Sequence, residues 1–491
     1  MKNDIVMYEK IYGIIKNKIQ CGILEGGSKL PSRANLCKEF NTSEKTVRRV
    51  LKMLEQDGLV ETSKRKRSVV AMNHDLWRQA ALTSLKKADA IAAVNMLKSG
   101  VLLCYPINGK GMALCSGKDW DIPQGIAERM DPDEPTEFWR LSNLFWRFFI
   151  SRNGNELILR AVDSLGISSL DILPGTREIR CRYKENLNEL IRTMRRGGSP
   201  EHVHFDDLYM LYGLSSEEKE GEVIYFISDD SPLWVGTEHI EQKLREGQER
   251  YSSVFLDILG LIDLGYYKLG DRLPSHNELQ KIYRVSIDTT IKAIQMLQEW
   301  GAVTTKRSQG IFVAMDLEGL KKIHIAPELI ASHVRRWLDC LELISLTVEG
   351  VAFHGAGRAS GEEAARLRGE LEKLWNDAYL YQVSPYVLLD FIVDHIEYDM
   401  LRAVYDVMRQ NYHIGRSIPK MVRREKTPVS RDIYNQCVEA ADTLIEGDAP
   451  AFAKKAADMF HLVHRLIVEE CKRLGYWKAA MEVYDGDALW K

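Results

Sequence analysis

The sequence predicts a mainly α-helical protein in which two short repeated modules alternate with two longer helical domains. Residues 30–70 and 273–313 align without a gap at an offset of 243, and 13 of these 41 positions are identical. Elsewhere, apolar residues recur at the three- and four-residue spacing of amphipathic helices. A chain of 491 residues also exceeds what one hydrophobic core holds. We therefore predict four domains, with the boundaries 1–72, 73–247, 248–316 and 317–491.

The composition is that of an ordinary globular protein, with 45% hydrophobic and 28% charged residues. No apolar run approaches the roughly 20 residues of a membrane span, and the N-terminus lacks the apolar core of a signal peptide. The eight cysteines are scattered and form no CxxC pair, which favours reduced thiols. We therefore expect a cytoplasmic protein without a membrane partner.

Charge is distributed unevenly between the two repeated modules. Residues 7–70 contain 14 Lys and Arg against 7 Asp and Glu, a net charge of +7. The matching residues 250–313 contain 8 basic and 6 acidic residues, a net charge of +2. Because the whole chain has a net charge of −3, the residues outside the two modules carry a net charge of −12. A basic module on an acidic body indicates a protein that presents one face to a polyanion. A solvated charged surface is the alternative.

The first module begins with two predicted helices. Isoleucines at helical spacing predict an amphipathic helix from Tyr8 to Cys21, which Gly22 would end. Ser32 follows a proline and is a suitable N-cap, because its hydroxyl can accept a hydrogen bond from a free backbone N–H of the first turn. A short helix is expected from there to about Phe40.

The module continues with a third helix and a β-hairpin. Ser43 is the expected N-cap of a helix that runs to about Gln56 and ends at Gly58, and residues 59–70 read as a hairpin with a basic tip. Three helices and a two-stranded hairpin form a winged helix-turn-helix. The second module repeats the pattern and adds a capping box from Ser275 to Glu278.

The string L-P-S, the helix S-x-x-T-V-R-x-x-L-x-x-L, the G-L-V triplet and the basic wing resemble the DNA-binding domain of GntR-family bacterial transcription regulators. This resemblance implies a double-stranded DNA operator as the partner. The N-terminal end of such a helix reaches base edges in the major groove, and a basic wing suits the backbone or minor groove. The expected contact residues of the first module are Arg33, Ser43, Glu44, Lys45, Thr46, Arg48, Arg49, Lys64, Arg65, Lys66 and Arg67. Simple capping is the alternative role of Ser43 and Thr46.

The second module departs from this pattern. Lys45 and Arg48 are replaced by Asp288, which would repel phosphates, and by Ile291, which reads no base well. Three roles stay open for this module: weak DNA binding, recognition of a different half-site, or packing. Its expected DNA contacts are Ser286, Thr289, Lys292, Lys306 and Arg307.

The domains between the modules are expected to be helical bundles. Residues 137–162 and 439–466 resemble the ligand-sensing domain of the FadR subfamily of GntR regulators, and the string LRAV occurs twice at an offset of 242. The whole chain therefore looks like a tandem duplication of a winged-helix plus effector-domain unit. In the last domain, helical spacing predicts helices over Ser332–Gly350, Gly361–Asn376, Val387–Gln410, Ser430–Glu446 and Pro450–Leu474.

Many members of that subfamily hold a metal through one Asp and three His, but the first two positions fall on Ser142 and Trp146 here. The only candidate ligands for a divalent metal in the second helical domain are weak ones: Asp390, Asp394, His395, His461 and His464. Ordinary surface or capping roles are the alternative for these residues. The stretch 202–207 is a second metal-like sequence. An aromatic cluster between Phe138 and Phe149 reads either as core or as the lining of an apolar effector pocket.

The leading hypothesis is a sequence-specific transcription regulator, acting as a repressor, whose two halves form an intramolecular pseudo-dimer on DNA. An organic acid or an apolar metabolite would bind the helical domains as effector, and a homodimer is possible. The alternative is an interaction scaffold with degenerate DNA-binding modules. An enzyme is less expected, because the sequence has no P-loop, no nucleophile elbow and no HExxH motif.

Overall fold

The structure is a computed structural model of the 491-residue chain. It describes residues 4–483 apart from 21–23, 25, 41, 64–65, 72–84, 89, 167–176, 199–224, 229–233, 235, 246–249, 321–322, 324, 326, 377–382 and 422–424. The chain divides into two compact units. The first comprises residues 1–247 with 398–404 and 486–491, and the second comprises residues 248–397 and 405–485.

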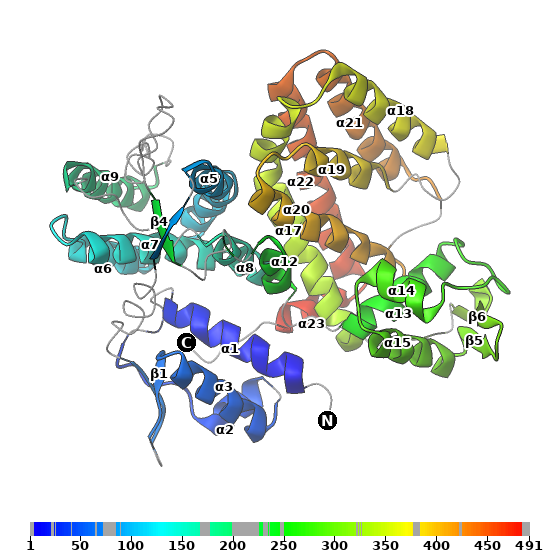
Figure 1. The fold of residues 1–491 in the computed structure, drawn as a ribbon, viewed down its shortest axis with the longest axis horizontal. Coiled ribbons are helices and arrows are strands. Elements are labelled where there is room, and N and C mark those ends of the chain that lie inside the picture. Colours follow the sequence, from blue (N-terminus) through cyan, green and yellow to red (C-terminus); the bar gives the residue numbers. More distant parts are fainter. Residues whose placement is uncertain are drawn as a thin grey trace. The chain divides into compact units, whose positions relative to one another are not determined.

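The first winged domain contains the predicted elements (Figure 1). Three helices, α1 (Asp4–Gln20), α2 (Arg33–Glu39) and α3 (Glu44–Gln56), precede the antiparallel strands β1 (Val60–Glu61) and β2 (Val69–Val70). The serine hydroxyls Ser32 Oγ and Ser43 Oγ cap α2 and α3 as the sequence predicts. The apolar faces of α1 and α3 meet in a core that includes Ile11, Ile15 and Val50, each 0% exposed.

The second winged domain repeats this arrangement in the second unit. It consists of α13 (Arg250–Asp263), α14 (His276–Tyr283), α15 (Ile287–Glu299), β5 (Val303–Lys306) and β6 (Gly310–Val313). The capping box of α14 is confirmed. The Ser275 N–H donates to Glu278 Oε2 at 2.7 Å, and this hydrogen bond lowers the pKa of the Glu278 carboxyl.

The backbone pairing of the two winged domains recurs at the sequence offset of 243. The Leu30 N–H donates to the Ser68 carbonyl at 2.9 Å, and the Leu273 N–H donates to the Ile311 carbonyl at the same distance. Each recognition helix also ends at a glycine in the left-handed region, Gly58 with φ 67° and Gly301 with φ 72°. The fold of the two copies is therefore the same down to individual main-chain hydrogen bonds.

The helical domain of the first unit packs around aromatic side chains. Its elements are α5 (Ala90–Ala113), η1 (Gly117–Trp120), α6 (Asp121–Arg129), α7 (Pro135–Arg152), α8 (Glu156–Ser164), α9 (Arg177–Arg195) and α12 (Glu238–Leu244). Phe138, Phe145, Phe148 and Phe149 on α7 are each at most 2% exposed and share one core with Tyr183 of α9. The aromatic cluster is therefore core, which was one of its two interpretations.

The same domain contains a small sheet that the sequence analysis did not anticipate. Strand β3 (Leu85–Ala88) pairs antiparallel with β4 (Tyr225–Ser228), in the register Leu85 to Ser228. The pairing joins two segments far apart in the sequence. No local sequence pattern predicts such a pair, because each strand is short and forms its backbone hydrogen bonds with a distant strand.

Helix α5 differs from the expectation that no segment has the composition of a membrane span. Within the described residues, its stretch Ile91–Ala113 is the one helix that is long and apolar enough to cross a membrane by length and composition, with a hydropathy of 1.2. The side chains of α5 that are fully buried in the unit include Met96, Leu103 and Ile107. A core helix has this pattern as well, so the composition alone decides nothing.

The helical domain of the second unit is a bundle dominated by two long helices. Its elements are α16 (Leu317–Leu320), α17 (Pro327–Ala356), α18 (Gly361–Asn376), α19 (Ser384–Asp394), α20 (Asp399–Tyr412), η5 (His413–Ser417), α21 (Pro428–Ile445), α22 (Ala449–Arg473) and α23 (Tyr476–Glu482). The first residues of α20, up to Val404, are grouped with the first unit. Helix α18 matches its predicted bounds. The helix predicted over Val387–Gln410 is instead two helices, which separate at a turn where Ile396 is fully buried.

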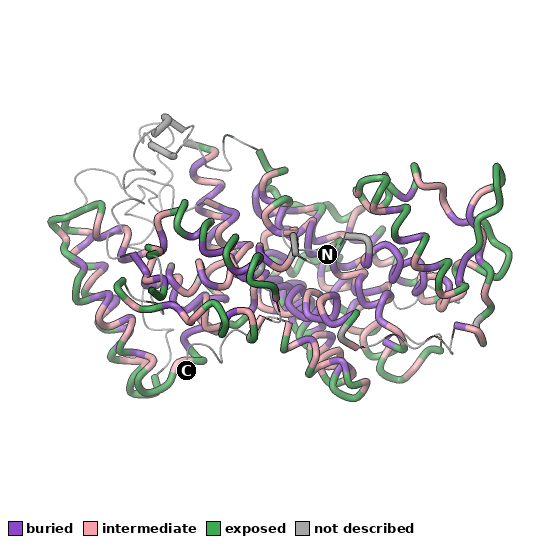
Figure 2. Tube along the Cα trace, turned by 90° about the horizontal axis from the view of Figure 1, so that it is seen from below, coloured by how far each residue is buried: buried purple, intermediate pink, exposed green. Residues whose placement is uncertain are grey.

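Buried polar contacts hold the second winged domain on its own helical domain. Asp257 of α13 accepts hydrogen bonds from Arg416 Nε of η5 at 2.6 Å and from Tyr283 Oη of α14 at 2.8 Å. His333 of α17 pairs with Ser252 Oγ at 2.7 Å. Helix α13 also approaches η5 closely, because a Cβ at Gly260 would overlap the Arg416 carbonyl oxygen. Figure 2 shows that buried and exposed residues alternate along the helices of the chain, as in amphipathic helices.

Candidate nucleic-acid interface

The start of α3 is organised by a hydroxyl pair. Ser43 Oγ accepts a hydrogen bond from the Thr46 N–H at 3.2 Å and lies 2.8 Å from Thr46 Oγ1. Thr46 is only 3% exposed, whereas Ser43 is exposed. Thr46 therefore offers almost no surface to a duplex and acts as part of the cap, while Ser43 both caps the helix and faces outward.

Three charged side chains stand at the exposed N-terminal end of α3. Glu44, Lys45 and Arg48 are all exposed, and Glu44 Oε1 accepts hydrogen bonds from Arg48 Nη2 at 2.9 Å and Nε at 3.1 Å. The two side chains retain 58% and 64% of their surface. An ion pair this exposed contributes little to stability. Arg48 can therefore exchange Glu44 for a guanine edge or a phosphate at little cost.

Arg49 and Arg33, the other two basic residues expected to contact DNA from the helices, differ in whether a neighbouring side chain holds them. Arg49 lies over the ring of Tyr8, with its guanidinium carbon 3.5 Å from the ring centroid. This cation–π contact orients Arg49 along α1. Arg33 is exposed at the start of α2, where the resemblance expects a phosphate contact.

The wing presents positive charge beyond the end of α3. Lys66 and Arg67 are exposed, whereas Lys64 and Arg65 lie outside the described residues. The base of the wing is anchored to α3, because the Thr62 N–H donates to Glu55 Oε1 at 3.2 Å. Fixed strands with exposed Lys and Arg suit a phosphate backbone, to which such residues contribute a salt-dependent attraction.

The second winged domain keeps the cap but changes the surface of its recognition helix. Ser286 Oγ lies 2.9 Å from Thr289 Oγ1, as in the first copy. Lys292, Lys306 and Arg307 are exposed, and Lys306 Nζ lies 5.0 Å from the centroid of the Phe312 ring. Exposed Ile287, Asp288 and Ile291 replace the charged residues at the start of the helix. Of these three basic residues, only Lys292 therefore lies on the recognition helix, and Lys306 and Arg307 lie on the wing.

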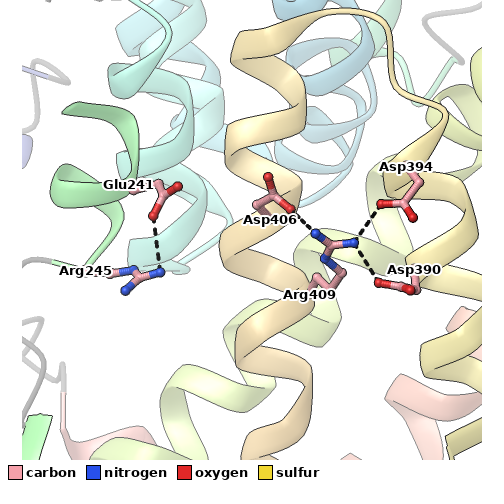
Figure 3. A network of polar contacts seen from close by, with 6 residues as sticks. All are labelled: Glu241, Arg245, Asp390, Asp394, Asp406 and Arg409. Carbon is pink, nitrogen blue, oxygen red and sulfur yellow. Dashed lines mark hydrogen bonds and ion pairs between the residues drawn. The ribbon is translucent and has the colours of Figure 1, made fainter. Parts of the chain in front are cut away.

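The weak metal candidates of the second helical domain do not form a metal site. Asp390 and Asp394 accept hydrogen bonds from Arg409 Nη1 at 2.6 and 2.9 Å, and Asp406 pairs with the same guanidinium (Figure 3). Figure 3 also shows a separate ion pair between Glu241 and Arg245. The Arg409 guanidinium thus already supplies these carboxylates with the positive charge that a divalent ion would bring.

The histidine candidates are occupied in other ways. His395 Nδ1 lies 2.7 Å from the Phe391 carbonyl, and His461 Nδ1 lies 2.8 Å from the Ala457 carbonyl. Each ring thus binds its own helix. Among the described residues, no three His, Cys, Asp or Glu side chains are placed to hold an ion. His464 is therefore also not part of a group of three potential ligands. Residues 202–207 lie outside the described part of the chain. Within the described residues, the five candidates therefore include no group of three that could hold the subfamily's metal.

The first helical domain carries a hydrogen-bonded group at the two positions where the resemblance places the first metal ligands. Tyr183 Oη lies 2.6 Å from Ser142 Oγ and accepts from Trp146 Nε1 at 2.7 Å. Burial raises the pKa of Tyr183 to about 12, so its hydroxyl stays protonated. This group satisfies three buried polar atoms and fixes α7 against α9.

Two adjacent arginines of α17, Arg335 and Arg336, could bind an acidic effector by their charge, but both are engaged within the protein. Arg335 Nε lies 2.8 Å from Asp339 Oδ1, and the Arg335 side chain is only 10% exposed. Arg336 Nη2 donates to Ser253 Oγ at 3.2 Å. Asp339 lies four residues after Arg335 on the same helix, whereas Ser253 of α13 becomes a neighbour of Arg336 only through helix packing.

Three helices with a hairpin wing, and a capped third helix that carries exposed basic residues, define the class of winged helix-turn-helix proteins. Within that class, residues 7–70 and 250–313 each match the family described as bacterial regulatory proteins, gntR family. The chain thus carries the GntR-family winged helix-turn-helix domain twice, which is the DNA-binding domain of a transcription regulator.

Two solved structures are similar to parts of the chain. Streptococcus agalactiae GntR is 17% identical, with a TM-score of 0.23, over 44% of this chain and 99% of that chain. E. coli McbR/YncC is 14% identical, with a TM-score of 0.22, over 45% of this chain and 99% of that chain.

Proposed function

We propose that this protein is a sequence-specific DNA-binding regulator in which the first winged domain makes the principal contacts. The observation that carries the proposal is the exposed end of α3, where Lys45 and Arg48 stand near a basic wing that includes Lys66 and Arg67. Ser43, Glu44, Arg33 and Arg49 complete the proposed surface, and Lys64 and Arg65 would extend its wing. Thr46 serves as their structural support.

One arrangement on DNA that follows from two winged domains in one chain is the intramolecular pseudo-dimer. In the pseudo-dimer, the second domain contacts an adjacent half-site through Ser286, Thr289, Lys292, Lys306 and Arg307. The exposed Lys306 and Arg307 favour this arrangement, whereas Asp288 and the neighbouring isoleucines oppose it. The tandem duplication of a FadR-like unit is part of the same proposal, because the hydrogen bonds of the two winged domains recur at one offset.

Regulation would come from the helical domains. We propose a cytoplasmic regulator, most simply a repressor, whose operator affinity changes when a small-molecule effector binds. Repression is the default outcome when a bound protein occludes a promoter. Catalysis is not part of the proposal, because a GntR-type regulator acts through its affinity for DNA.

Alanine substitutions test which winged domain reads DNA. The operator is first selected by the full-length protein from a random pool of double-stranded DNA. We expect Arg48→Ala to weaken binding to the selected DNA by about 10- to 100-fold, since one bidentate base contact contributes about 1–3 kcal/mol. Lys118→Ala is the matched control, because it removes one exposed positive charge from η1 and should leave affinity nearly unchanged.

Lys292→Ala tests the contribution of the second domain in the same assay. A small effect, with a large effect of Arg48→Ala, supports the proposed assignment. If Arg48→Ala left specific affinity unchanged while Lys292→Ala abolished it, the assignment would be wrong. If the protein bound no double-stranded DNA even at low salt concentration, the result would instead favour an interaction scaffold.

A further inference from the structure

The second winged domain has three isoleucines where the first has charged residues. At the offset of 243, Glu39, Glu44 and Arg48 become Ile282, Ile287 and Ile291. Ile282 lies near the end of α14, and the other two lie on the first turns of α15. All three replacements run in the same direction, from charge to branched apolar side chain, within ten residues of sequence.

These isoleucines are exposed although neighbouring apolar side chains are buried. Ile282, Ile287 and Ile291 retain 59%, 43% and 38% of their surface. On α15, Ile294 and Leu297 are at most 3% exposed, so the helix has a complete buried face without the two exposed isoleucines. Within its described residues, the first winged domain has no large hydrophobic side chain this exposed. The exposed face of α15 is therefore a second apolar face.

A duplex fits this face poorly. Isoleucine offers neither a hydrogen bond to a base edge nor a charge to a phosphate, and Asp288 repels phosphates at the place of Lys45. Contact with thymine methyl groups is the one favourable interaction that DNA would provide. An exposed apolar face rimmed by polar residues more often marks an interface between proteins.

The charges beside the isoleucines make the face self-complementary. Ile287 and Ile291 are four residues apart and lie on one stripe of α15, and Asp288 and Lys292 are four apart on the adjacent stripe. Within the described residues, neither Asp288 nor Lys292 forms an ion pair. If two copies of α15 pack antiparallel about a two-fold axis, Ile287 meets Ile291 of the other copy. Asp288 then meets Lys292 twice.

We propose that the exposed face of α15 binds the same face of a second copy of this chain. The contact is isologous, because one patch serves both partners and each charge finds its opposite. One helix pair and its surroundings form a small interface, at the weak end of those found in specific complexes. The resulting dimer carries two first winged domains, so it would suit a symmetric operator.

Self-association of the full-length protein without DNA tests the proposal by sedimentation velocity over roughly 1–100 µM, a range that suits a small interface. We expect the Ile287→Glu/Ile291→Glu variant to associate at least about 10-fold more weakly, since two carboxylates would be buried at the interface. Ile445→Glu on α21 is the control, because Ile445 is similarly exposed at 46% and should tolerate the change. Circular dichroism verifies that each variant folds.

A charge swap gives a second readout that does not depend on the isoleucines. Asp288→Lys or Lys292→Asp alone should weaken association, whereas the Asp288→Lys/Lys292→Asp double variant should restore it, since opposite charges again face each other. Unchanged association of the double glutamate variant, or a wild-type protein that stays monomeric, overturns the proposal. If that variant loses only affinity for A·T-rich DNA, the isoleucines read thymine methyls instead. Because DNA is absent from the main assay, the outcome is independent of the proposed function.

Discussion

The first and second winged domains share a backbone and differ in what they present and what holds them. Both have a serine-capped recognition helix, a terminal glycine and a wing with matching main-chain hydrogen bonds. The first exposes Lys45 and Arg48 at the start of that helix, and the second exposes Asp288 and Ile291 at the same positions. The comparison teaches that the buried pattern preserves this fold while the exposed positions are free to specify different partners.

The attachment of the two domains also differs. Asp257, which binds Arg416 and Tyr283 in the second unit, corresponds at the offset of 243 to Ile14 in the first. Instead, the first domain uses Asp57 at the end of α3, which accepts a hydrogen bond from Tyr12 of α1 and lies 3.6 Å from Lys16. The first domain thus ties its own helices together. In the second domain, Asp257 contacts both α14 of its own domain, through Tyr283, and the helical domain, through Arg416.

The largest expected effect comes from breaking the attachment of the second winged domain. Asp257→Ala leaves the Arg416 guanidinium without its carboxylate, whose presence raises the pKa of Arg416 against the effect of burial. Loss of one partner of a buried pair costs about 3–5 kcal/mol, and we expect about 2–3 kcal/mol because the Arg416 side chain is 32% exposed. Hydrogen exchange of α13 amides should accelerate about 100-fold.

Asp263→Ala, at the end of the same helix, is the matched control and should change this exchange little. The exchange of α3 in the first winged domain should not change in either variant. If α13 stays as protected in Asp257→Ala as in the wild type, the ion pair does not attach the domain.

A smaller effect is expected from pH through His413 of the second unit. Burial and the nearby Arg416 lower the pKa of His413 to about 4, against the opposite effect of Asp257. The unfolded chain therefore binds a proton below about pH 6.5, which the folded protein takes up only near pH 4. The neutral His413 therefore contributes to the free energy of unfolding fully above pH 6.5, and this contribution falls by about 2 kcal/mol at pH 5.

Denaturant unfolding at pH 7, 6 and 5 measures this loss, with hydrogen exchange to assign it to a unit. His413→Phe keeps a ring beside Tyr386, whose centroid lies 4.0 Å away, and should flatten the dependence. Residues 7–70 contain no histidine, so α3 should keep its protection over this range. An equal loss of protection in both winged domains would contradict this account.

The smallest expected effect separates the two wings. Removing two phosphate contacts with Lys66→Ala/Arg67→Ala should reduce the slope of log K against log salt by about 1.8, since each contact contributes about 0.9. The matched Lys306→Ala/Arg307→Ala variant should change the slope by less than about 1. Equal changes for the two wings would show that both contact DNA and would favour the pseudo-dimer.

Much of the fold could be predicted because it depends on local patterns. The caps at Ser32, Ser43 and Ser275 and the bounds of α18 follow from side-chain chemistry and helical spacing within a few residues. The pairing of β3 with β4 could not be predicted, because each strand has a partner more than a hundred residues away. The turn between α19 and α20 also carries no glycine or proline to reveal it.

The features of the candidate nucleic-acid interface also divide into those that local sequence predicts and those that depend on helix packing. The positions of Lys45, Arg48 and the wing follow from the repeat and the periodicity of α3, because a helix fixes which side chains share a face. The burial of Thr46 and the stacking of Arg49 on Tyr8 depend on how α1 packs against α3. A signal for the attachment was present in the replacement of Ile14 by Asp257, but nothing in the sequence names Arg416 as its partner.

By itself, the sequence determined the number of winged domains, the bounds of most of their helices and the contrast between a charged and an apolar reading helix. These properties depend on spacing and residue type, which act over a few residues. Only the tertiary structure decided that three aspartates pair with Arg409, and that Asp257 joins two domains. Such contacts require side chains from distant helices to meet, and helix packing alone determines which of them do.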